Sequence, residues 1–130
     1  MIWTLMMLLA AAEPAKLEPG EQLVIVGRDL ENLDACPSTG RVTNLGTASD
    51  AFLAVRTAPS AKARVKDKVK AGQVLTLCDD SGDWMGVVYS LESDGKVDCG
   101  VTTPSAYFGA YRGPCRFGWV NSRYVEVIAG

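Results

Sequence analysis

The sequence of 130 residues contains no histidine. This absence removes the commonest general base and excludes the Ser-His-Asp and Cys-His arrangements of nucleophilic catalysis. The chain also lacks a Cys-x-x-Cys pair, a phosphate-binding G-x-x-x-x-G-K-[ST] loop and a G-x-G-x-x-G fingerprint. We therefore expect a noncatalytic protein without a bound cofactor.

Charge is also sparse and nearly balanced. The chain has 13 basic and 15 acidic side chains and a formal net charge of −2. A general nucleic-acid-binding protein is strongly basic, so we expect no nucleic-acid partner. Hydrophobic residues make up 48% of the chain, which is typical of a folded domain and excludes a disordered one.

The acidic cluster Asp79-Asp-Ser-Gly-Asp83 does not fit a calcium loop. An EF-hand counted from Asp79 would place Trp84 where glycine is needed and Ser90 where a bidentate glutamate is needed. We interpret the cluster as a hairpin turn and expect no metal site.

The first twelve residues are almost entirely apolar and contain no Lys or Arg. Such a run is too short to span a bilayer but suits the hydrophobic region of a secretory signal, and Ala10-Ala-Ala12 supplies small residues for cleavage. The alternative is a buried or amphipathic N-terminal helix. We expect a signal peptide over 1–12, a mobile leader over 13–20 and one domain over 21–130, exported to the periplasm or cell envelope with no membrane span in the mature chain.

The four cysteines form an even set in a chain that is predicted to be exported. An oxidising compartment would join them in two disulfides, for which three pairings are possible. The pairing that we favour is Cys99 with Cys115, which closes a local loop, and Cys36 with Cys78, which ties an early strand to a later one.

Alternation of apolar and polar residues predicts an all-β fold. The segment Glu21–Gly27 is rich in β-branched residues and predicts an extra N-terminal strand. Further on, the basic residues fall on even positions, which in a strand would gather them on one face, either as a cationic binding stripe or as a solvated edge. They are Lys62, Arg64, Lys66, Lys68 and Lys70.

Three later segments carry a specific pattern: Phe52-Leu-Ala-Val-Arg-Thr-Ala-Pro-Ser60, Ala71-Gly-Gln-Val-Leu-Thr-Leu-Cys-Asp-Asp-Ser-Gly-Asp-Trp84 and Gly118-Trp-Val-Asn-Ser-Arg-Tyr-Val125. Their order resembles the bacterial SH3-like (SH3b-type) domain. In that family, L-x-V-R-x-x-P opens a small barrel, G-x-x-V-x-V crosses it, a tryptophan follows the hairpin and G-W-V-x-x-x-Y closes it. The resemblance covers about residues 39–128 and implies a small SH3-like barrel.

The resemblance also implies a function. Aromatic side chains that line a shallow groove in related folds bind extended peptides, so the expected activity is recognition of peptidoglycan or a wall-associated peptide. Trp84 and Tyr124 would form the apolar floor of such a groove, with Arg56 and Asn121 as polar contacts. The alternative is that these aromatic side chains pack in the core, which we expect of Trp119.

The chain departs from the family pattern between Leu91 and Phe117, where a long segment precedes the closing strands. A loop of this length is functional or is held by its own disulfide. Tyr107, Phe108 and Tyr111 lie within it. They either form an exposed tip that contacts a protein partner, as in an inhibitor or immunity-type protein, or fold back as a lid over the barrel.

Overall fold

The structure is a computed structural model, and it describes residues 20–28, 34–91, 98–102 and 106–130. The predicted signal peptide and almost all of the predicted leader lie outside the described residues. Within them, the only helical element is a short 3-10 turn, η2 (Ser122–Tyr124). No helix in this part of the chain has the length and apolar character needed to cross a bilayer.

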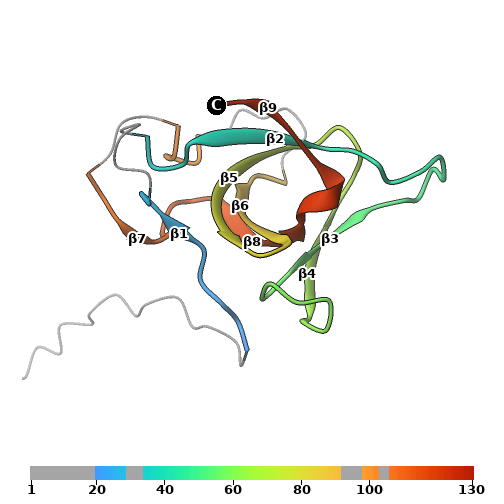
Figure 1. The fold of residues 1–130 in the computed structure, drawn as a ribbon, viewed down its shortest axis with the longest axis horizontal. Helices are drawn as coiled ribbons and strands as arrows, with labels where there is room; N and C mark the ends of the chain where they lie inside the picture. The colour runs from blue at the N-terminus through green and yellow to red at the C-terminus, as the bar shows by residue number, and fades with distance from the viewer. Residues whose placement is uncertain (1–19, 29–33, 92–97, 103–105) are drawn as a thin grey trace, which may run out of the picture.

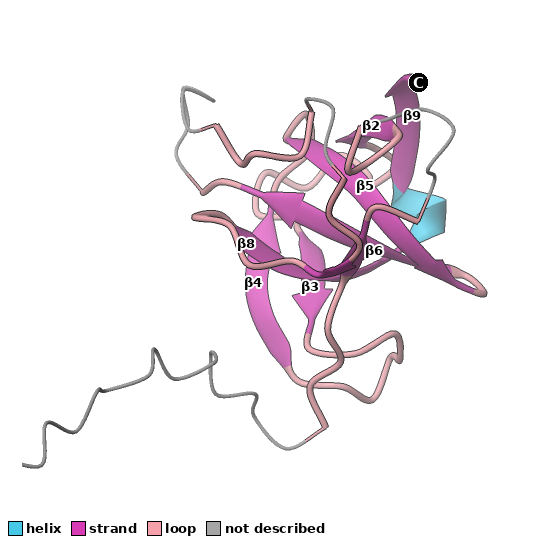
Figure 2. Ribbon diagram, turned by 90° about the vertical axis from the view of Figure 1, so that its left-hand side faces the viewer, coloured by secondary structure: helices cyan, strands magenta, loops and turns pink. Residues whose placement is uncertain are grey.

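The described residues form two antiparallel sheets (Figures 1 and 2). The main sheet has seven strands in the order β4-β3-β8-β6-β5-β2-β9, and β1 pairs with β7 in a separate two-stranded sheet. The strands are β1 (Ile25–Val26), β2 (Ser38–Val42), β3 (Leu53–Arg56), β4 (Val65–Val69), β5 (Val74–Ser81), β6 (Trp84–Tyr89), β7 (Gly109–Ala110), β8 (Arg116–Asn121) and β9 (Val125–Ala129).

The predicted all-β class is confirmed. The main sheet curves, as Figure 1 shows for β5, β6 and β8, but it is not closed. Its end strands are β4 and β9, and the strand pairing of the described residues does not join them.

An inner core fills the concave side of the main sheet. Alternate residues of each strand point to it because side chains in a strand alternate between the two faces. Its buried members are Val42, Leu53, Val55, Val69, Leu75, Leu77, Val87, Tyr89 and Val120.

An outer core lies on the opposite face of the same strands. Val88 of β6 and Trp119 of β8 point into it, and both are fully buried. Strands buried on both faces read as continuous apolar runs, which explains Val87-Val-Tyr89 and Trp119-Val120 in the sequence. The remaining buried members are Val24, Val26, Ala35, Cys36, Cys78, Val101 and Tyr111.

The outer core is covered by an N-terminal strap, residues 20–28. The backbone N–H of Gln22 donates to Thr57 O at 2.8 Å, and its carbonyl accepts from Trp119 Nε1 at 3.0 Å. Farther along, the buried carboxylate of Asp79 accepts from Ile25 N at 3.0 Å and from Arg28 Nε at 2.8 Å. These bonds fix the strap at both ends.

The predicted extra N-terminal strand exists but does not extend the main sheet. Ile25 pairs with Ala110 and Val26 with Gly109, so β1 joins the segment that precedes the closing strands. The N-terminal strand and the segment before the closing strands are therefore paired with each other rather than with the main sheet. That segment is also shorter than predicted at its C-terminal end, because β8 begins at Arg116.

Both favoured disulfides are confirmed. Cys36–Cys78 lies in the outer core, with both residues buried, and Cys99–Cys115 closes the shorter loop. The sequence separations that they bridge are 42 and 16 residues, respectively. The first disulfide attaches the segment just before β2 to β5 beneath the strap.

Candidate functional site

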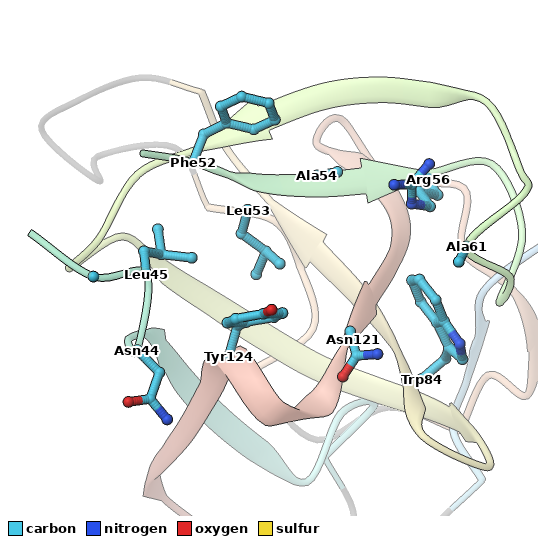
Figure 3. Close-up of a pocket in the computed structure, with 11 residues that line it drawn as sticks. Asn44, Leu45, Phe52, Leu53, Ala54, Arg56, Ala61, Trp84, Asn121 and Tyr124 are labelled. Carbon is cyan, nitrogen blue, oxygen red and sulfur yellow. The ribbon is translucent and has the colours of Figure 1, made fainter. Parts of the chain in front are cut away.

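A groove of about 560 Å³ opens on the surface of the main sheet (Figure 3). It is formed by the loop between β2 and β3, by β3 itself, by the start of β6 and by the end of β8 with η2. The lining residues are Asn44, Leu45, Gly46, Phe52, Leu53, Ala54, Arg56, Ala61, Trp84, Asn121 and Tyr124.

All four side chains that the sequence analysis selected for a ligand groove line this one groove. Arg56, Trp84, Asn121 and Tyr124 come from three separate segments of the chain, and the sheet brings them together. This co-location is a property of the fold.

The strand register explains why three of them share a face. Trp84 is the partner of Asn121, and Arg56 is the partner of Trp119. Directly paired residues project to the same side of an antiparallel sheet. Arg56, Trp84 and Asn121 therefore lie on the outer face, whereas Leu53 and Tyr124 line the groove from the side of the inner core.

Trp84 is placed by the β5–β6 hairpin. Gly82 has a φ of 61°, a left-handed conformation that glycine adopts without a steric penalty, and it turns the chain so that Trp84 pairs with Ser81. The indole is half-buried and packs against the outer core. One side of the ring is thus supported by the protein while another side remains open to the groove.

Asn121 and Tyr124 are placed by η2. Asn121 is the N-cap of this turn, and its Oδ1 accepts from Arg123 N at 3.1 Å. The cap bond uses the carbonyl of the amide, which leaves the amide N–H groups as donors. Tyr124 packs against the inner core at the middle of the groove (Figure 3), and the Arg123 guanidinium lies 5.7 Å from its ring centroid.

Arg56 ends β3 and is the only charged residue among those that line the groove. Its Nη1 donates to Ala63 O at 2.9 Å, a bond that fixes the side chain against the turn between β3 and β4. A guanidinium has five N–H donors, so this bond occupies a minority of them.

The two ends of the groove differ in chemistry (Figure 3). Leu45, Phe52 and Leu53 make one end mainly apolar, with the polar Asn44 beside Leu45, whereas Arg56 and Trp84 lie at the other end. Phe52 is 43% exposed, which is high for such a large apolar side chain. An open surface with an apolar end and a cationic end is suited to a ligand that is itself apolar at one end and anionic at the other.

Comparisons of the chain with protein-family models, with curated proteins and with solved structures found no match. The described residues contain no group of three or more side chains of the metal-binding types Cys, Asp and Glu close enough to hold an ion.

Sequence reasoning missed the apolar end of the groove. Phe52, Ala54 and Arg56 alternate with the buried Leu53 and Val55. This period of two places Phe52 and Arg56 on the same face, so the alternation was the signal that identifies Phe52 as a groove residue.

Of the three aromatic residues in the segment between β6 and β8, only one has the strong exposure expected of a tip. Phe108 is 58% exposed, but Tyr111 is 6% exposed and belongs to the outer core. The Tyr111 hydroxyl donates to Cys99 O and accepts from Cys115 N, so it braces the second disulfide. Tyr107 is half-buried, with its hydroxyl bonded to Ala110 O. Tyr111 therefore folds back over the outer core, which agrees with the lid alternative for this residue.

The predicted single basic face does not form. Strand β4 contains only Lys66 and Lys68 of the five basic residues. Lys66 is largely buried, pairs with Glu21 of the strap at 3.2 Å and lies 4.1 Å from the Phe117 ring centroid. Lys68 is exposed and lies 4.6 Å from the Phe52 ring centroid, near the apolar end of the groove.

A partly buried polar cluster links β4, β6 and β8. The Asp67 carboxylate accepts from the Tyr89 hydroxyl and from Arg116 Nε. Burial and, secondarily, the bond to Asp67 raise the pKa of Tyr89 above its ordinary value of about 10. Burial also raises the pKa of Tyr111.

These raised values predict alkaline instability. The folded state keeps protons on Tyr89 and Tyr111 that the unfolded state releases, so the free energy of unfolding is unaffected by these groups below about pH 10 and falls above it. Urea unfolding at a series of pH values measures this decline, which should be smaller in Tyr89→Phe. Full ionisation of all tyrosines with the fold still intact would contradict the prediction.

Proposed function

We propose that this protein is a noncatalytic, exported binding module that holds an extended peptide in the groove. The target is peptidoglycan or a wall-associated peptide of the bacterial cell envelope, as the SH3-like sequence pattern implies. In this proposal, the curved sheet is an open form of the SH3-like barrel. The family landmarks support this assignment because they fall on neighbouring strands, β3, β8, β6 and β5.

The observation that carries the proposal is the composition of the groove. Two aromatic side chains, Trp84 and Tyr124, are held in place by the protein beneath them. Preorganised aromatic side chains provide large contact area at a small entropic cost, and they are enriched among residues that dominate binding energy. Arg56 and Asn121 supply donors for the carbonyl or carboxylate groups of a peptide.

The two disulfides support export. Such bonds persist in oxidising compartments and are rare in the reducing cytosol. Cys36–Cys78 is buried in the outer core, and its second cysteine belongs to β5. The periplasm or cell envelope is the compartment that we propose.

Co-sedimentation with purified peptidoglycan sacculi tests the proposal. We expect saturable pelleting of the oxidised protein, and an apparent affinity that falls about tenfold or more in Trp84→Ala because the aromatic floor is lost. Phe108→Ala is the matched control, since this exposed ring does not line the groove. Absence of pelleting, or equal pelleting by Trp84→Ala, would contradict wall binding through the groove.

A second candidate is a protein-interaction module that acts through the segment between β6 and β8, as in an inhibitor or immunity-type protein. The observation that favours it is the 58% exposure of Phe108 next to β7. This candidate makes the opposite prediction, in which Phe108→Ala abolishes binding to the protein partner and Trp84→Ala does not. Tyr111→Ala is unsuitable as a test because Tyr111 is buried.

A further inference from the structure

We propose that the groove recognises the C-terminal end of a peptide, with the free terminal carboxylate at Arg56 and an apolar side chain at Leu45 and Phe52. The inference deepens the proposed function and rests on it. It follows from the charge of the groove, the donors at one end and the turn that bounds that end.

The charge of the groove is the first step. No carboxylate is present among the lining residues, and Arg56 is the only ionised one. Two further cations lie against aromatic rings of the lining, namely Arg123 at Tyr124 and Lys68 at Phe52. The lining residues and these two ring contacts thus bring three cations and no carboxylate, in a chain whose net charge is −2. Such a surface attracts an anionic ligand group.

The donors at the Arg56 end are the second step. A guanidinium presents paired N–H groups that match the two oxygens of a carboxylate, and this fork is stronger than a neutral hydrogen bond. The bond from Nη1 to Ala63 O holds the side chain in position before a ligand arrives. Asn121, whose cap bond uses its oxygen, adds amide N–H donors nearby.

The boundary of the groove is the third step. The chain turns between β3 and β4, and Ala61 of this turn lines the groove beside Arg56 and Trp84 (Figure 3). A peptide that places a side-chain carboxylate on Arg56 has further main chain to accommodate near this turn. A peptide that ends at Arg56 has no such requirement. The geometry therefore favours the terminal carboxylate over that of an aspartate or glutamate.

This arrangement makes the groove sensitive to the state of the peptide end. A terminal carboxylate that has been converted to an amide, as in a cross-linked or amidated peptide, has lost its negative charge and one acceptor oxygen. The protein would then bind free-ended peptides in preference to joined ones. Binding of free-ended peptides should weaken as salt is raised, because salt screens the attraction between the peptide carboxylate and the Arg56 guanidinium in the open groove.

Calorimetric titration of the oxidised full-length protein with synthetic peptides tests the inference. The probes are N-acetyl-Leu-Ala-Ala with a free carboxylate, the same peptide as its C-terminal amide, and N-acetyl-Leu-Ala-Glu-Ala-amide, which carries only a side-chain carboxylate. We expect the free-ended peptide to bind about tenfold or more tightly than either of the others, as a charge-assisted fork requires. In Arg56→Gln this preference should disappear, whereas Arg41→Gln, on the exposed part of β2 outside the groove, should retain it.

The outcomes separate the two proposals. Equal binding of the three peptides, or tightest binding of the glutamate peptide, would overturn the carboxyl-terminus inference and leave the groove as a peptide site. No binding of any peptide, with sacculi still pelleted in a Trp84-dependent manner, would also overturn this inference alone. If sacculi are not pelleted either, both proposals fail. Arg56→Lys, which keeps the charge but lacks the fork, should bind the free-ended peptide with intermediate affinity, and its urea unfolding shows whether loss of the Ala63 bond has affected the fold.

Discussion

Replacement of both Cys36 and Cys78 by alanine should lower the free energy of unfolding by about 4 kcal/mol, the entropic value for a closed loop of this length. The disulfide spans 42 residues and is buried in the outer core, where it attaches the segment just before β2 to β5. Small domains have total stabilities of about 5–15 kcal/mol, so the loss is a large fraction of the whole. Urea unfolding monitored by far-ultraviolet circular dichroism measures it.

The matched control is the double replacement of Cys99 and Cys115 by alanine. This disulfide spans 16 residues, and its cysteines are partly exposed at the outer-core boundary, so its removal should cost less, about 3 kcal/mol. We expect the same order of destabilisation when each disulfide is reduced: loss of Cys36–Cys78 should cost more than loss of Cys99–Cys115. A larger loss of unfolding free energy on removal of Cys99–Cys115 would show that the outer core does not depend on the Cys36–Cys78 link.

Trp119→Ala should destabilise the protein by about 3–5 kcal/mol, as large-to-small substitutions of buried aromatic residues do. The indole is fully buried in the outer core, and its Nε1–H donates to the Gln22 carbonyl of the strap. The substitution therefore leaves a cavity and removes a bond that holds the strap on β8. Thermal or urea unfolding measures the change.

Two variants give this prediction its controls. Trp119→Phe keeps most of the apolar volume but not the N–H donor, so it should cost less than Trp119→Ala. Trp84→Ala removes the same type of side chain from the half-buried groove position and should cost least. If Trp84→Ala were as destabilising as Trp119→Ala, Trp84 would be primarily a structural residue, and its use as a binding probe would fail.

The groove residues were predictable because their positions are set by local patterns. Trp84 follows a glycine-containing hairpin, and Tyr124 lies at a fixed spacing after Gly118-Trp119 in a recognisable closing segment. Alternation with buried neighbours places Arg56 on the outer face. The pairing of Cys99 with Cys115 was likewise suggested by their short separation, because closing a short loop costs little entropy.

The outer core was not predictable in the same way. Its cover depends on the pairing of β1 with β7, which lie far apart in the chain and contribute two residues each. Such short strands carry almost no periodic signal. For the same reason, the sequence left open whether Tyr111 lies on an exposed tip or folds back, and Trp119 was assigned to packing without the strap that covers it.

The basic residues show a different reason for error. An alternating charge pattern predicts a strand face, but it does not predict where the strand begins. Strand β4 starts at Val65, and a register irregularity follows Val55 in its pairing with β3. The strap also supplies Glu21 to Lys66. Tertiary contacts therefore dispersed a pattern that looked continuous in the sequence.

The most direct test of the central claim, that the groove is the ligand site, is a heteronuclear correlation spectrum of the ¹⁵N-labelled oxidised protein titrated with soluble stem peptides released from sacculi. We expect the largest shift changes on the backbone amides around Arg56 and Asn121 and on the Trp84 indole N–H. The Trp119 indole N–H, bonded to Gln22 beneath the strap, should change little. Changes centred on Phe108 and β7, with Trp84 unaffected, would show that the groove is not the ligand site.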